Sequence, residues 1–131
     1  MNQRNPLLIL EGSFISSKYK LYYKVNSNDD GNYPHFHVYN NETGKKKIDC
    51  CIRLDCCKYF LHGKHKFPIT NKKIILQLHK AMTRKEYYRN TNSMVPLYTV
   101  LVNIWNSGNR VKCNTNSIPN YSLLTADFIS E

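Results

Sequence analysis

The chain has 131 residues, a length typical of one domain that buries roughly two-thirds of the surface its unfolded form exposes. Lysine and arginine number 19 against 9 acidic residues, a net charge of +10. This excess favours a polyanionic partner, because lysine and arginine release the counterions condensed on phosphates. No apolar run is long enough for a membrane span or the core of a signal peptide, so we expect a soluble cytoplasmic protein with reduced cysteines and no membrane partner.

Two strands are predicted near the start of the chain, over residues 7–15 and 18–25. The second alternates apolar and polar residues, the period-two pattern of a strand with one buried face. A polar loop, 26–32, follows, with a turn signal at Asp30-Gly31. The loop is followed directly by residues 33–39, the most informative segment of the chain.

The run Tyr33-Pro34-His35-Phe36-His37-Val38-Tyr39 places two histidines two residues apart in a predicted strand. Side chains of a strand alternate between its faces, so His35 and His37 share one face while Phe36 and Val38 take the other. With the apolar pair in the core, the strand presents two imidazoles side by side. A metal site, an acid–base pair or a polynucleotide-binding surface can be built from this arrangement.

The next strand is predicted over residues 48–56. Its apolar positions share a face with those of the histidine strand if the hairpin closes through a three-residue loop, Glu42-Thr43-Gly44, with Gly44 in the left-handed conformation. Directly opposed side chains then have Cβ atoms about 5 Å apart, close enough to interact. The predicted cross-strand pairs are His37 with Asp49 and His35 with Cys51.

Four of the five cysteines lie on this strand or directly after it, but adjacent strand residues point to opposite faces and no Cys-x-x-Cys is present. We expect Cys50 and Cys56 in the core, and Cys51 and Cys57 as partly exposed thiols. A zinc site combining Cys51 with the paired histidines is an alternative, but no fourth ligand is evident. We therefore expect no metal and no cofactor.

Two helices are predicted in the second half of the chain, over 70–89 and 94–107. Thr70 is a suitable N-cap for the first. The second has apolar residues at helical spacing that place Trp105 in the core. The expected fold is α+β, an antiparallel sheet of four to five strands with the two helices packed on one face. It forms a single domain over 1–131, with a weakly patterned tail at 109–131 in which a short terminal helix can dock.

The first predicted helix carries a basic stripe opposite its apolar face. Acidic compensation is absent, because Glu86 is the only acidic residue between positions 56 and 126. A basic loop precedes this helix, and His62 and His65 in it are candidates for a proton-donor role or for phosphate contact. The residues predicted to contact nucleic acid are Lys73, Lys80, Arg84, Lys85, Arg89, Lys64 and His65.

The run Pro34-His35-Phe36-His37-Val38, followed by a hairpin and by Leu61-His62-Gly63 before a proline and a helix, resembles the bacterial proteins grouped as domain-of-unknown-function family 4160. The resemblance covers roughly residues 33–82. Genes of that family often sit beside small partners in arrangements that look like toxin–antitoxin operons. The resemblance implies a cognate protein partner and makes His35 and His37 candidate site residues, although this chain is longer, more basic and richer in cysteine.

Two functions stay open. In the first, the chain is a toxin-like endoribonuclease of a bacterium or mobile element, with His35 and His37 as general base and partner and with Asp49 orienting His37. In the second, it is not an enzyme and binds a nucleoprotein complex through its basic surface, as a phage inhibitor of the anti-CRISPR type does. Loss of RNA cleavage in a His35, His37 double variant favours the first. Full activity in that double variant, together with loss of activity on charge reversal at Lys80 and Arg84, favours the second.

Overall fold

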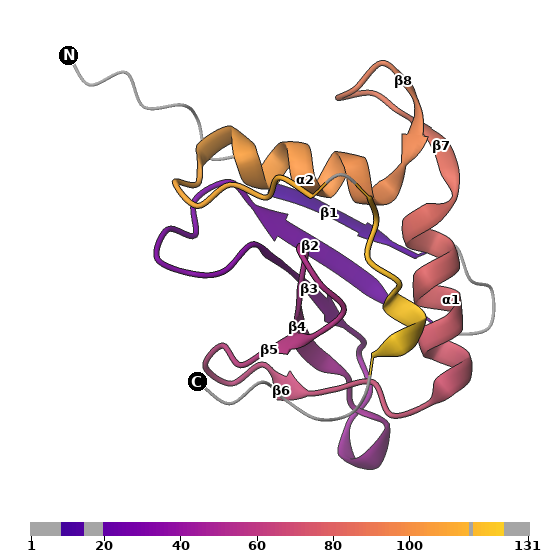
Figure 1. The fold of residues 1–131 in the computed structure, drawn as a ribbon. Helices are drawn as coiled ribbons and strands as arrows, with labels where there is room; N and C mark the ends of the chain where they lie inside the picture. Colours follow the sequence, from indigo (N-terminus) through magenta and orange to yellow (C-terminus); the bar gives the residue numbers. More distant parts are fainter. Residues whose placement is uncertain (1–8, 15–19, 116, 125–131) are drawn as a thin grey trace.

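A computed structural model describes residues 9–14, 20–115 and 117–124. It confirms the α+β class, with an antiparallel sheet and two α-helices (Figure 1). The strands are β1 (Ile9–Ser13), β2 (Tyr22–Asn26), β3 (His35–Tyr39), β4 (Asp49–Arg53), β5 (Tyr59–Phe60), β6 (Lys66–Phe67), β7 (Lys85–Tyr88) and β8 (Ser93–Pro96). The helices are α1 (Lys72–Thr83) and α2 (Leu97–Gly108), with 3-10 turns η1 (Gly44–Lys46) and η2 (Tyr121–Leu123).

The main sheet follows chain order from β1 to β5, and β6 pairs with β4 on the edge that β5 also uses. Alternating apolar residues make one face of this sheet the core. On β3 the predicted pair Phe36 and Val38 is fully buried, opposite Ile52 and Cys50 of β4. The other face of β3 and β4 therefore carries the histidines, as the period-two pattern predicts.

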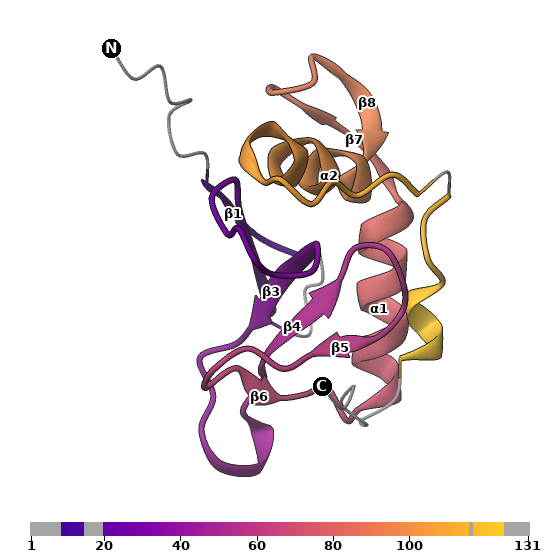
Figure 2. The same ribbon diagram turned by 60° about the vertical axis from the view of Figure 1, so that its left-hand side comes forward.

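Both α-helices lie beside the main sheet (Figure 2), and their buried residues belong to the same hydrophobic core as those of the sheet. Helix α1 buries Ile75, Leu78 and Met82, which recur at helical spacing, and α2 buries Trp105. Among the described residues, neither helix has the length and apolar character needed to cross a bilayer.

The predicted first helix is too long at both ends. Asn71 caps α1 instead of Thr70, by accepting a hydrogen bond from the Lys73 N–H at 2.9 Å. The helix ends at Thr83, and β7 and β8 form a separate hairpin in place of its last turns. The hairpin turn includes Asn92 with φ of 50°, and the Tyr87 hydroxyl donates to the Asn92 side chain at 2.7 Å. Turn geometry and β-prone residues such as Tyr87 thus outweigh helix propensity here.

The C-terminal segment belongs to the domain as far as it is described. Tyr121 is fully buried, its ring 5.8 Å from that of Phe36, and its backbone N–H donates to His79 Nδ1 on α1 at 3.2 Å. The rest of the predicted tail, residues 125–131, lies outside the described residues.

The predicted register of the β3–β4 hairpin is wrong by two residues. His37 lies opposite Cys51, His35 opposite Arg53, and Asp49 opposite Tyr39. The loop is longer than three residues because Asn40 closes it: its side chain accepts from the Ile48 N–H at 2.8 Å and donates to the Lys46 carbonyl at 2.9 Å. Gly44 does take the left-handed conformation, with φ of 63°. A shift of two residues preserves the faces, so the core pattern survives.

Candidate functional site

A pocket of about 540 Å³ opens on the histidine-bearing face of the sheet. It is bounded by β1 to β4, by the loop between β2 and β3, and by the connection between β5 and β6; no residue of α1 or α2 lines it. Its ionisable residues, tyrosine aside, are Glu11, Lys24, Asp29, His37, Lys47, Asp49, His62, Lys64 and His65. A concave site with several convergent ionisable groups is the usual setting for binding or catalysis.

Four of the five histidines of the chain lie together here, three of them in the pocket lining and His35 behind it. His35 and His37 come from β3, with ring centroids 5.1 Å apart. His62 and His65 come from the β5–β6 connection, which folds back through a bridge between these two residues and a left-handed Gly63. The ring of His65 lies 4.9 Å from that of His37, and the ring of His62 lies 5.3 Å from that of His35.

Asp49 orients His65, not His37 as the predicted register implied. His65 Nδ1 lies 2.6 Å from Asp49 Oδ1. A carboxylate accepts hydrogen bonds and does not donate them, so Nδ1 carries the proton and Nε2 is left as the nitrogen that can take one up. The pair is half-buried and belongs to the pocket lining. This is the arrangement of a carboxylate-supported general base.

His37 is held in its neutral form. Burial, together with the charges of His35, His65 and His62, lowers the pKa of His37 to about 3. Its Nδ1 lies 3.4 Å from the sulfur of Cys51. Burial raises the pKa of Cys51, so the thiol stays protonated and its S–H donates a hydrogen bond to this nitrogen. The neutral ring then carries its own proton on Nε2. His37 is therefore a fixed hydrogen-bond donor beside His65, and a poor base.

His35 lies behind the pocket and is not among the residues that line it. Its side chain is 1% exposed, and its ring also packs against that of Trp105 on α2 at 5.1 Å. Nδ1 lies 2.7 Å from the carbonyl of Tyr33, which can only accept, so Nδ1 carries a proton. Nε2 lies 3.1 Å from Asp29 Oδ2 and has no hydrogen-bond partner among the described residues. His35, predicted to be catalytic, thus cannot contact a substrate directly in this conformation.

Asp29 is held in place by two asparagines, one in its own loop and one directly after α2. The side chain of Asn32 donates to Asp29 Oδ1 at 2.7 Å, and the backbone N–H of Asp29 donates to Asn109 at 2.6 Å. Asn109 is buried and directly follows α2, so the helix holds the β2–β3 loop in place. Burial raises the pKa of Asp29, but contact with His35 and the hydrogen bond from Asn32 lower it by more, so the pKa lies below its usual value.

The predicted nucleic-acid contacts fall into two groups. Lys64 and His65 line the pocket. The remaining five are exposed on α1 or in the segment directly after it, away from the pocket lining: Lys73, Lys80, Arg84, Lys85 and Arg89. Arg84 is paired with Glu86 at 2.7 Å. The basic stripe and the histidine pocket are thus separate surfaces.

Two of the cysteine predictions are wrong. Cys51 is fully buried, because β5 pairs over it through Phe60, and Cys56 is only half-buried because β4 ends at Arg53 and its alternation stops there. Cys50 is buried and Cys57 half-buried, as expected. All five cysteines are free thiols.

The sequence gives little indication that Asp29 and His62 lie beside His35. Asp29 stands in a loop that is predicted only as a turn, and His62 is predicted only as a proton donor or a phosphate contact, without its neighbours Asp29 and His35. No local spacing signals either position, since Asp29 meets His35 and His62 only through tertiary structure. The density of histidines between positions 35 and 65 is the one sequence feature that points to them.

Comparisons of the chain with models of known protein families, with curated proteins and with solved structures found no match. The resemblance to family 4160 therefore rests on the quoted residues alone.

Proposed function

We propose that this protein is a small endoribonuclease whose active site is the histidine pocket. The observation that carries the proposal is the Asp49–His65 pair at 2.6 Å, which faces the neutral ring of His37 in an open pocket. Lys24, Lys47 and Lys64 line the same pocket and supply positive charge for a phosphate group. The net charge of +10 adds general attraction for a polyanion.

In the proposed reaction, His65 Nε2 accepts the proton of a ribose 2′-hydroxyl. The 2′ oxygen attacks the adjacent phosphorus, the bond from phosphorus to the 5′ oxygen breaks, and water in the open pocket supplies a proton to the leaving oxygen. The products are a 2′,3′-cyclic phosphate and a 5′-hydroxyl end. His37 donates its Nε2 hydrogen to a phosphoryl oxygen, where charge develops, and His65 then returns its proton to solvent.

This assignment changes the roles expected from the sequence. His65 is the general base, Asp49 orients it, and His37 is a hydrogen-bond donor. His35 becomes a positioning residue. The resemblance to family 4160 implies a cognate protein partner. A partner that covers this pocket would inhibit the proposed reaction, and a partner that leaves it open would not.

The proposed reaction requires a 2′-hydroxyl, which gives a direct test. The purified protein should cleave a single-stranded RNA and leave cyclic phosphate ends, resolved by electrophoresis and mass spectrometry. An RNA of the same sequence with one 2′-deoxy residue should resist cleavage at that residue only. Equal cleavage at the deoxy position, or no cleavage of any RNA, contradicts the proposal.

A second function, binding of a nucleoprotein without catalysis, is favoured by a different observation. Lys73, Lys80 and Lys85 are all exposed on or beside α1, on a surface separate from the pocket. Such a stripe can follow a nucleic-acid backbone whether or not the pocket is catalytic.

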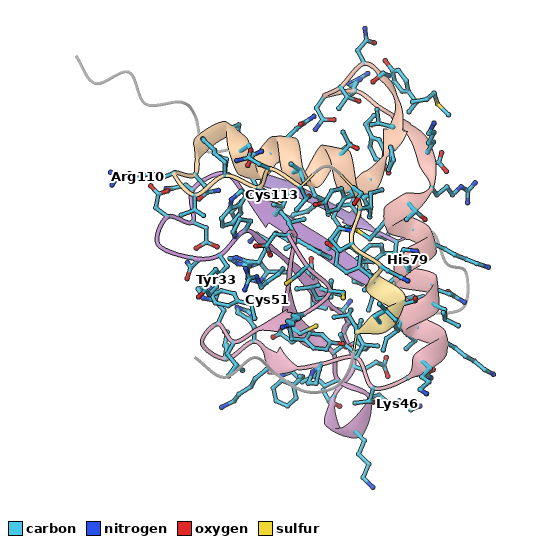
Figure 3. All side chains as sticks on the ribbon, in the orientation of Figure 1. Tyr33, Lys46, Cys51, His79, Arg110 and Cys113 are labelled. Carbon is cyan, nitrogen blue, oxygen red and sulfur yellow. The ribbon has the colours of Figure 1, made fainter. Side chains whose placement is uncertain are left out.

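Replacing Lys80 with alanine should weaken binding to single-stranded RNA and should reduce the slope of log affinity against log salt by about 0.7, the contribution of one phosphate contact. Fluorescence anisotropy over a salt series measures this. Arg110→Ala is the matched control, because Arg110 is 91% exposed and lies across the molecule from α1, on which His79 is labelled (Figure 3). An unchanged slope in the Lys80 variant removes the stripe from the binding surface.

A further inference from the structure

The most unusual atom in the pocket region is Nε2 of His35. It is buried, no hydrogen bond reaches it within the described part of the chain, and it lies 3.1 Å from a carboxylate oxygen of Asp29. Since Nδ1 holds the ring proton toward the Tyr33 carbonyl, Nε2 in a neutral ring presents a lone pair to a negatively charged group. Two acceptors this close repel each other unless a proton on Nε2 or a bound cation lies between them, so this contact is a place where a cation would be stabilised.

A third ligand atom completes the group. One ligand atom each from Asp29, His35 and His62 lie within 4.8 Å of one another. Ligands about 2.1 Å from one metal ion stand roughly 3.0 to 3.4 Å apart, so the contact between His35 and Asp29 already has the required spacing. His62, whose ligand atom lies within 4.8 Å of the other two, is the residue that would adjust its position to bind the ion.

The surroundings of these residues have the character of an outer ligand shell. The ring N–H of a metal-binding histidine usually donates to a backbone carbonyl or a carboxylate, which fixes the other nitrogen toward the metal. His35 has this arrangement through Tyr33. Asp29 is likewise fixed, with Asn32 on one carboxylate oxygen and Asn109 on its backbone N–H, which leaves Oδ2 for the metal.

We infer that Asp29, His35 and His62 form a binding site for one divalent transition-metal ion of the zinc class. Two histidines and one carboxylate are a known ligand set for catalytic zinc and for non-haem iron, with further positions left to water or substrate. Asp29 and His62 line the pocket, so an open position faces it. This departs from the metal-free site expected from the sequence.

A competing ligand set shares one residue with this one. His35, His37 and Cys51 also bring ligand atoms within 4.8 Å of one another. In that set, however, Cys51 and His37 are already partners at 3.4 Å, and Cys51 is fully buried. Both sets contain the Nε2 of His35, which is unpartnered in the residue ranges described, but only the group with Asp29 has two of its three residues in the pocket lining.

The metal inference does not rest on the proposed reaction, because binding is measured without RNA. If both hold, the ion stands beside His37 and His65 and supplies a fixed positive charge for the phosphate. If RNA is not cleaved but the ion binds, only the proposed reaction fails.

The test uses the full chain, freed of metal with a chelator and titrated with Zn²⁺ alone by calorimetry. We expect one ion per chain. Asp29→Asn and His62→Asn should each weaken binding by at least about 100-fold, beyond the roughly 10- to 100-fold effect of losing an outer-shell partner. Asp30→Asn is the matched control, because the Asp30 carboxylate contacts Arg110 and takes no part in the cluster. This variant should bind Zn²⁺ as the natural chain does.

Substitution with Co²⁺ distinguishes the two ligand sets by absorption spectroscopy. The inferred set gives ligand-field bands without the charge-transfer absorption of a cobalt–thiolate bond. A thiolate band that disappears in Cys51→Ala would overturn the inference in favour of the competing set. Absence of stoichiometric Zn²⁺ binding, or wild-type affinity in the Asp29 and His62 variants, would also overturn it. Both of these variants change half-buried pocket residues, so circular dichroism serves to confirm that they fold.

Discussion

Replacing His65 with asparagine should lower the rate of RNA cleavage by about 10²- to 10⁴-fold, the usual contribution of a positioned general base. This corresponds to roughly 3 to 5 kcal/mol of transition-state stabilisation. Asparagine retains an amide near the position of Nδ1, 2.6 Å from Asp49, but has no basic nitrogen at the position of Nε2. The loss should therefore appear in kcat more than in KM, measured under single-turnover and steady-state conditions.

The partner of His65 offers a second variant with a matched control. Asp49→Asn should also slow cleavage, because an amide no longer selects the tautomer with its proton on Nδ1. Glu11→Gln changes another carboxylate in the pocket lining, one that pairs with Lys24 at 3.6 Å, and should leave the rate within a few-fold. Equal effects of the Asp49 and Glu11 substitutions would mean that the pocket charge matters and the dyad does not.

Replacing Trp105 with alanine should lower the free energy of unfolding by about 3 to 5 kcal/mol, as expected for a large aromatic side chain lost from a core. Trp105 is 1% exposed, its ring packs 5.1 Å from that of His35, and its Nε1–H donates to the carbonyl of Val111 at 2.7 Å. The substitution leaves a cavity and an unpaired carbonyl together. Urea unfolding followed by circular dichroism measures the change.

Leu76→Ala is the control for this loss. Leu76 is also a large apolar residue on a helix, but it is 53% exposed, so its removal should cost no more than about 0.5 kcal/mol. Trp105→Phe should fall between the two, because it keeps much of the ring packing and loses the hydrogen bond to Val111. A Trp105→Ala variant as stable as Leu76→Ala would contradict the role of Trp105 as a core residue.

The sequence predicts best where the physical signal is local. The strand pattern around His35 assigns Phe36 to the core correctly, because alternate side chains of a strand must face opposite ways. Helical spacing likewise predicts correctly that Trp105 of α2 is buried in the hydrophobic core. The predicted register of the β3–β4 hairpin is wrong by two residues because the side chain of Asn40 closes the loop in place of backbone hydrogen bonds. A hydrophobic pattern of period two is the same before and after such a shift, so it cannot detect the error.

The C-terminal end of helix α1 is a second feature that local sequence patterns do not predict. Its apolar face is evident as far as Met82, but the stop at Thr83 depends on the pairing of β7 with β8. Propensity alone does not decide between a further helical turn and a strand whose paired residues lie five to eleven positions further along the chain. The hydrogen bonds of the hairpin decide it.

By itself the sequence determined one strongly basic α+β domain and a strand that aligns His35 and His37 on one face, because charge and alternation are properties of neighbouring residues. Only the tertiary structure decided which groups these histidines meet. Asp49 reaches His65 because β6 returns along β4, and Asp29 reaches His35 because Asn109, 80 residues further along the chain, holds the intervening loop. Contacts of that range arise from the closure of the whole core, which no local pattern encodes.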